Sequence, residues 1–306
     1  MPLQTNAKKG RKIVRAVMKA LQRAWRAVMR RVTGRSELGR ILKSNEGYTN
    51  ELVRAIALSI ARSSEKEAVF GHKIFDVNLV STHLAQMKGI SDQDKPRLDW
   101  CLQIFNIVNM VHDKVAVLQK TPFDTTSEDQ VAQLEALWSS LQPSVRRESP
   151  GGWGVLGFQN GDRPETDFRG MGLLGLVQLV FFSQTRNAEA RQILADSTNP
   201  KRYFPFAAAG INVTAFTKVM LEQRRLDTHI YEAIVKHMPA GKLPEDQEML
   251  VSAGFTAFNV IYGDEYVEFS RFWHVSDPSS TFAFPGIFGT IKHRAFSRFP
   301  SLLEDV

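Results

Sequence analysis

Apolar residues recur at spacings of three and four along most of this chain, and this period constrains the fold more than any other feature. Alternating Val, Ile and Thr runs bounded by turn residues, which are typical of strands, are nearly absent. The pattern therefore predicts an all-α fold. Helices are expected over residues 50–68, 79–87, 98–118, 169–183, 188–195, 208–223, 228–236 and 246–273.

The predicted helices extend over a length that one large domain can fill. Ser127 and Gln130 resemble a capping box ahead of a further helix that runs to Leu141. The segment 143–152, rich in Pro, Gly and Ser, is interpreted as a surface loop because the composition does not change across it. We therefore expect a single compact multi-helix domain over residues 44–306, with a separate arm over residues 1–43. The single cysteine, Cys101, cannot form an internal disulfide and indicates a reducing, cytoplasmic compartment.

Positive charge is concentrated in the arm. Residues 1–43 hold 13 Lys and Arg residues against one acid, a net charge of +12, whereas the rest of the chain carries −5. A mildly acidic body argues against nucleic acid as a partner. Val14, Val17, Leu21, Trp25 and Val28 follow helical spacing, and Gly34 is expected to end this helix. The cations on its polar side include Arg15, Lys19, Arg23 and Arg26.

Three interpretations of this basic amphipathic helix stay open. A basic helix with Trp at the edge of its apolar face suits an anionic membrane surface, which predicts peripheral membrane association. The same pattern, acid-free through Ser36, is typical of a mitochondrial presequence. The apolar face could also dock on the body. No uncharged run reaches the length of a membrane-spanning helix, and no secretory signal is predicted.

The segment 153–176, WGVLGFQNGDRPETDFRGMGLLGL, is the least ordinary part of the chain. Thr166 and Asp167 are good N-cap residues, so Arg169 is expected in the first turn of the helix that follows. A cation is unfavourable at that end of the helix dipole, which makes Arg169 a functional candidate. Gly170, Gly172 and Gly175 spell GxGxxG, but no apolar strand precedes them, so they are interpreted as close-packing glycines.

Ten residues of this segment form a spaced pattern, WxxxGFQxxxxPxTDxRxxGxxxL. They are Trp153, Gly157, Phe158, Gln159, Pro164, Thr166, Asp167, Arg169, Gly172 and Leu176. The pattern resembles the signature of the ELMO (engulfment and cell motility) domain. Four residues separate Gln159 from Pro164, where the family pattern has three. Residues 32–38, 121–124, 206–212 and 269–273 also resemble the short ELMO domain-containing proteins, in which the domain occupies most of the chain.

The resemblance implies a GTPase-activating protein for Arf-family GTPases, especially Arf-like ones, with Arg169 as the residue on which activity depends. It also implies that the protein itself needs no cofactor, because GTP and Mg²⁺ belong to the partner. The alternative is a non-catalytic scaffold that binds GTPases or exchange factors in cytoskeletal or phagocytic signalling. No zinc site is predicted, because the seven histidines show no HxxxH or HExxH spacing.

Two roles stay open for Arg169. It is either a catalytic finger or a structural brace that is buried against Asp167 or Glu165. Asp167, Gln159 and Thr166 are candidate supporting or GTPase-contacting residues. Trp153 and Phe158 are expected to be core anchors, and Gly157, Pro164, Gly172 and Leu176 complete the structural signature.

Overall fold

The computed structural model describes residues 17–18, 20–21, 24–25, 27–147, 152–242 and 247–303. Within these residues every regular element is helical, which confirms the predicted all-α fold. None of the described helices has the length and apolar character needed to cross a bilayer. The α-helices outside the arm are α2 (Glu37–Ser44), α3 (Asn50–Ala61), α4 (Lys66–Phe70), α5 (Val77–Lys88), α6 (Lys95–Lys120), α7 (Glu128–Leu141), α8 (Gly172–Thr185), α9 (Asn187–Ser197), α10 (Phe206–Glu222), α11 (Asp227–Val235), α12 (Gln247–Ser276) and α13 (Phe284–Arg298). Three short 3₁₀ helices are η1 (Trp153–Leu156), η2 (Pro164–Gly170) and η3 (Thr281–Ala283).

The chain divides into two compact units. The first comprises the described residues within 1–109, 234–247 and 302–306, and the second those within 110–233 and 248–301. Helix α6 contributes its N-terminal part to the first unit and its C-terminal part to the second. The signature lies entirely in the second unit.

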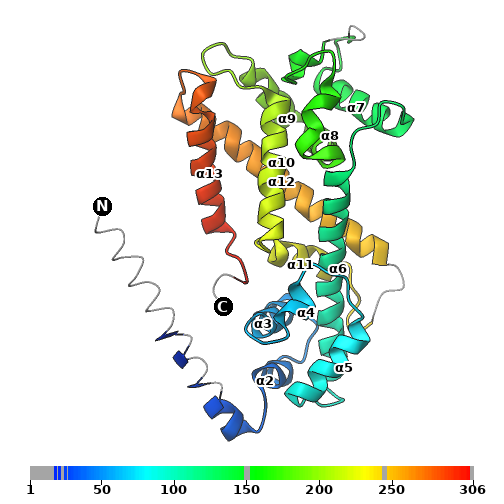
Figure 1. Ribbon diagram of the computed structural model, residues 1–306, viewed down its shortest axis with the longest axis vertical. Coiled ribbons are helices and arrows are strands. Elements are labelled where there is room, and N and C mark those ends of the chain that lie inside the picture. Colours follow the sequence, from blue (N-terminus) through cyan, green and yellow to red (C-terminus); the bar gives the residue numbers. More distant parts are fainter. Residues whose placement is uncertain are drawn as a thin grey trace. The chain divides into compact units, whose positions relative to one another are not determined.

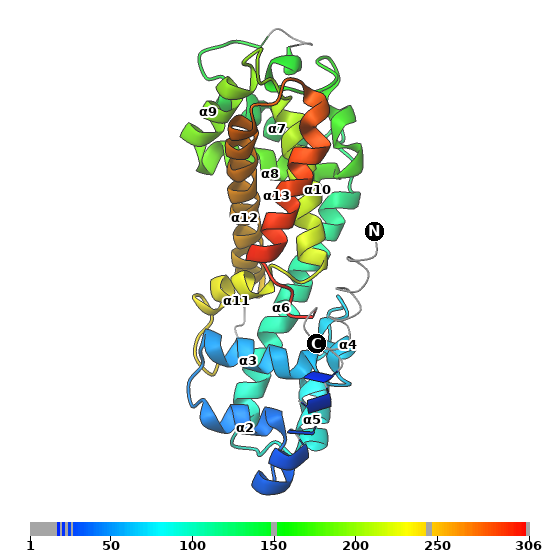
Figure 2. The same cartoon turned by 90° about the vertical axis from the view of Figure 1, so that its left-hand side faces the viewer.

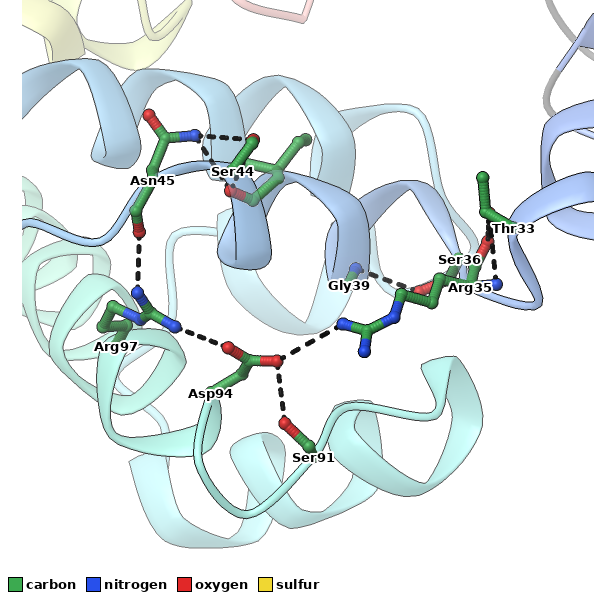
Figure 3. Close-up of polar contacts among 10 residues, drawn as sticks. Thr33, Arg35, Ser36, Gly39, Ser44, Asn45, Ser91, Asp94 and Arg97 are labelled. Atoms are coloured by element: carbon green, nitrogen blue, oxygen red, sulfur yellow. Dashed lines mark hydrogen bonds and ion pairs between the residues drawn. The ribbon is translucent and has the colours of Figure 1, made fainter.

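In the first unit, α2 packs on α3, and Leu38 and Leu42 of α2 are buried. Residues 37–43, which the charge pattern assigns to the arm, thus form a packed helix. Asp94 anchors this region, because it accepts hydrogen bonds from Ser91 (2.7 Å) and Arg97 and lies 3.9 Å from a guanidinium nitrogen of Arg35 (Figure 3). Its side chain is almost fully buried, so these partners offset the cost of burying its charge.

An aromatic core holds the second unit together. Helices α10 and α13 lie side by side (Figures 1 and 2), α12 crosses behind α10 in the view of Figure 1, and aromatic rings of the three helices contact one another. Phe288 of α13 contacts Phe216 of α10 and Phe269 of α12, with ring centroids about 6 Å apart. The Tyr266 hydroxyl donates a 2.5 Å hydrogen bond to the Phe206 carbonyl, which joins α12 to the start of α10.

Several helix predictions need correction. The single helix expected over residues 50–68 is broken between α3 and α4. The Ser63 hydroxyl donates a hydrogen bond to the Ile60 carbonyl and accepts one from the Glu65 backbone amide, and these bonds replace helical ones. The capping box at Ser127 and Gln130 is wrong. Ser127 makes no side-chain cap within the described structure, and Gln130 instead accepts a 2.7 Å hydrogen bond from the Asp124 amide. Helix α13 was not predicted.

The arm is described in part. Gly34 adopts φ +64°, in agreement with the predicted end of the arm helix. Six apolar side chains of the described arm residues are each more than half exposed; they are Val17, Met18, Leu21, Trp25, Val28 and Val32. Arg15, Lys19, Arg23 and Arg26 lie outside the described residues.

Candidate functional site

Buried aromatic side chains hold the first part of the signature in place. Trp153 and Phe158 are buried, and their ring centroids lie 5.9 Å apart with the edge of one ring on the face of the other. Trp153 contacts Trp138 of α7 in the same way, and Phe158 contacts Phe168 of η2. The Arg147 guanidinium lies 4.6 Å above the Trp153 ring. These contacts fix the two ends of the signature loop to each other.

Gly157 brings this loop against the start of α10. It adopts φ +78°, and a Cβ at this position would lie 2.2 Å from the backbone nitrogen of Phe206. The Ala208 amide also donates a 3.3 Å hydrogen bond to the Gly157 carbonyl. Only glycine allows two backbones to approach this closely with a positive φ. The contact places Gln159 beside α10.

Gly157→Ala is therefore expected to destabilise the protein by at least about 2 kcal/mol, because a left-handed backbone and overpacking each add about 1 kcal/mol or more. The measurement is a thermal or denaturant melt. Gly170→Ala is the matched control, since a Cβ there meets nothing within 4 Å and φ is not positive. An equal melting temperature for the two variants would contradict this account of Gly157.

The polar turn between Gln159 and Pro164 is ordered by side-chain hydrogen bonds. The Asn160 side-chain oxygen accepts from the amides of Asp162 (3.1 Å) and Arg163 (3.0 Å). Asp167 accepts a 2.7 Å hydrogen bond from the Gln159 amide across the loop. Partial burial raises the pKa of the Asp167 carboxyl, against the opposing effects of the Gln159 amide and the Arg169 charge. Asp167 thus closes the turn.

The backbone that follows Arg169 is fixed by the end of α6. The Gln119 side chain donates a 2.9 Å hydrogen bond to the Gly170 carbonyl, and the Leu173 amide donates one of 2.9 Å to the Thr121 carbonyl. Gly172 adopts φ +51°, and a Cβ there would lie 2.5 Å from the carbonyl oxygens of Gln119 and Thr121. The close-packing interpretation of this glycine therefore has a physical basis. Pro164 and Leu176 are buried on either side.

The expected position of Arg169 in the first turn of a helix is wrong. Thr166 and Asp167 lie inside η2 and do not cap α8: the Thr166 hydroxyl bonds the Arg163 carbonyl, and Asp167 bonds the Gln159 amide. Arg169 falls in the last turn of η2, where a cation is not unfavourable. The position of Arg169 relative to the helix dipole is therefore not unfavourable and does not mark it as a functional residue.

Arg169 is nevertheless unusual by its surroundings. Its side chain is exposed, and within the described part of the chain no hydrogen bond or ion pair holds it. Glu165 pairs instead with Arg163 (3.0 Å), whereas the Arg169 charge lowers the pKa of the Asp167 carboxyl. A fixed backbone thus carries an exposed guanidinium, whose charge acts on the Asp167 carboxyl.

Arg169 lines a cavity of about 240 Å³. The structure brings all four candidate site residues to this cavity, since Gln159, Thr166 and Asp167 line it too. Helix α10 supplies Ala208, Ile211 and Asn212, which sequence reasoning did not select as site residues. The sequence held one indication that these residues matter, because segment 206–212 resembles the short ELMO domain-containing proteins. The cavity presents one cation, one carboxylate and neutral amides.

Comparison with known proteins gives consistent results. The profile of the ELMO/CED-12 family matches residues 113–288. The chain is 31% identical over 277 residues to ELMO domain-containing protein B of Dictyostelium discoideum, covering 86% of this chain and 90% of that protein. It is 28% identical over 285 residues to ELMO domain-containing protein 2 of Mus musculus (91% and 90%), and 30% identical over 292 residues to ELMO domain-containing protein 1 of the same species (87% and 84%). No solved structure matches the chain.

Proposed function

The chain belongs to the ELMO/CED-12 family, and on this premise we propose that it is a GTPase-activating protein for Arf-like small GTPases, with Arg169 supplied in trans as an arginine finger. One observation carries the proposal: Arg169 is exposed and makes no hydrogen bond or ion pair in the described structure, on a backbone held by Gly172 and α6. A finger needs this combination, because its guanidinium must be able to enter the partner while the backbone that carries it stays fixed.

The chemistry of GTP hydrolysis explains why an arginine suits this role. Negative charge builds on the phosphoryl oxygens in the transition state, and an inserted arginine lowers the barrier by about 4–7 kcal/mol, or 10³–10⁵ in rate. The planar guanidinium donates two parallel hydrogen bonds, which a lysine cannot do. GTP and Mg²⁺ would be held by the partner, so this chain contributes only the cation and the surface that positions it.

The test is single-turnover GTP hydrolysis on a panel of Arf-family GTPases. Acceleration of at least one of them by the wild-type protein is the expected result. Binding to a GTP-loaded GTPase without acceleration would favour the scaffold alternative. Acceleration of none of them would overturn the catalytic proposal.

For the arm, we propose binding to an anionic membrane surface, which places the protein on membranes from the cytoplasmic side. Two observations support this proposal: the charge of +12 over residues 1–43 and the exposed apolar side chains from Val17 to Val32. Cations near the headgroups attract anionic lipid, and the apolar face gains by entering the headgroup boundary.

Deleting residues 1–33 is expected to abolish cosedimentation with vesicles that contain anionic lipid. Wild-type binding should weaken with salt, because the Debye length falls from about 30 Å at 0.01 M to about 3 Å at 1 M. Changing Arg15, Lys19, Arg23 and Arg26 to Gln should weaken it strongly, since each cation adds about 1 kcal/mol. Equal binding to neutral vesicles would contradict the electrostatic account. Import into isolated mitochondria with removal of the arm would support the presequence interpretation instead.

A further inference from the structure

A second cavity borders the one that holds Arg169. It measures about 210 Å³ and is lined by Phe204, Pro205, Ala209, Trp273, Thr281 and Phe284 together with three further residues. Those three, Gln159, Ala208 and Asn212, also line the Arg169 cavity. The two cavities are therefore neighbours. All of these residues lie in the second unit.

Phe282 is an exposed residue that follows a lining residue of the second cavity in the sequence. It lies between Thr281 and Phe284, which line that cavity, and its side chain is 93% exposed. No other large apolar side chain in the described residues is as exposed. A single exposed apolar residue is ordinary, but an exposed aromatic ring offers a partner a large apolar area to bury.

The backbone that carries Phe282 is firmly held. The Ala283 amide donates a 3.2 Å hydrogen bond to the Ser280 carbonyl, which closes η3. Phe284 stacks on Phe288 with ring centroids 5.2 Å apart and contacts Phe269 at 5.4 Å. A ring on a fixed backbone has only two side-chain torsions to restrict on binding, so little entropy is lost when a partner covers it.

The size of a protein interface connects Phe282 with Arg169. A specific interface buries about 800 Å² on each partner, equivalent to a disc of about 16 Å radius. A GTPase that receives Arg169 must cover the cavity around it, and a footprint of this size extends over the neighbouring cavity as well. We propose that the surface formed by the two cavities and Phe282, here called the Phe282 surface, is where the GTPase docks, with Phe282 as its apolar anchor. This inference rests on the proposed function.

The residues that line the two cavities indicate the kind of partner surface that fits them. The residues lining the two cavities include one cation, Arg169, and one acid, Asp167, and the others are apolar or uncharged. Docking here therefore relies on an apolar patch of the partner beside its nucleotide.

Phe282→Ser tests the inference. Single-turnover hydrolysis is measured on the responsive GTPase at increasing concentrations of this protein. The variant should need about 10- to 30-fold more protein for half-maximal acceleration, while the maximal rate stays within about twofold. Phe282→Leu should restore most of the affinity. Leu79→Ser is the matched control, because Leu79 is 70% exposed on α5 in the other unit.

Direct binding separates this inference from the proposed function. The affinity for each GTPase loaded with a non-hydrolysable GTP analogue is measured in an Arg169→Lys background, with and without Phe282→Ser. Acceleration and binding that are unchanged by Phe282→Ser would overturn the docking inference and leave the catalytic proposal intact. If binding depends on Phe282 but the wild-type protein does not accelerate GTP hydrolysis, the docking inference is supported and the catalytic proposal is overturned. Neither binding nor acceleration on any GTPase would overturn both.

Discussion

Arg169→Lys is expected to lower the maximal acceleration of GTP hydrolysis by about 10³-fold or more, which is the lower end of what an arginine finger supplies. Lysine keeps the positive charge but lacks the planar fork that reaches two oxygens at once. The half-saturating concentration should change little, because the Phe282 surface, and not Arg169, carries the apolar contact area. Single-turnover kinetics at saturating protein measure this loss directly.

The same variant should remain fully folded. Arg169 is exposed and makes no hydrogen bond or ion pair in the described structure, so the melting temperature should stay within about 2 °C of wild type. Arg163→Lys is the matched control: Arg163 is 70% exposed in the same loop and pairs with Glu165, and its replacement should leave the hydrolysis rate unchanged. A strongly lowered melting temperature for Arg169→Lys would indicate a structural role.

Asp227→Ala is expected to cost about 3–5 kcal/mol of folding stability, the typical cost of removing one partner from a buried ion pair. Asp227 and Arg224 are both almost fully buried, and a guanidinium nitrogen of Arg224 lies 2.9 Å from the Asp227 carboxylate. His112 lies 3.5 Å from the other carboxylate oxygen, and the Tyr231 hydroxyl donates a 3.4 Å hydrogen bond. Removing the carboxylate takes away a counter-ion that lies 2.9 Å from the buried Arg224 charge.

Denaturant unfolding measures this cost, and its pH dependence has a definite sign. Burial opposes ionisation of Asp227, but the Arg224 charge and His112 hold the pKa of its carboxyl below the ordinary value. The stabilisation is therefore complete above the unfolded pKa of about 4 and is lost as pH falls through the lower folded pKa. The difference between wild type and Asp227→Ala should shrink in strong acid. Asp264→Ala, which removes an exposed partner of Arg186, should cost less than about 1 kcal/mol.

Helix positions could be predicted wherever the apolar period is uninterrupted. The range 98–118 lies within α6 and the range 208–223 nearly coincides with α10, because apolar residues recur at helical spacing along both segments. Helix α13 was not predicted, since Gly286 and Gly289 weaken helices and a proline such as Pro285 is compatible with a helix only in its first turn. Phe284 and Phe288 stabilise it through contacts with α12, which local sequence does not reveal.

The candidate site could be predicted in its residues but not in its local structure. Asp167 has the sequence features of an N-cap, yet its carboxylate accepts from Gln159, eight residues earlier in the chain. The contribution of α10 depends on the contact between Gly157 and Phe206, which joins segments 49 residues apart in sequence. Neither contact can be predicted from local propensity, because both are formed by tertiary packing.

The most direct test of the central claim is the affinity of the protein for a GDP-loaded Arf-like GTPase with and without aluminium fluoride, which mimics the phosphoryl group in the transition state. If Arg169 enters the active site of the GTPase, the wild-type protein should bind at least about 100-fold more tightly with the fluoride, as transition-state analogues do. Arg169→Lys should lose this gain. An equal affinity of wild type in both states, or the same gain for the lysine variant, would contradict the assignment of Arg169 as the finger.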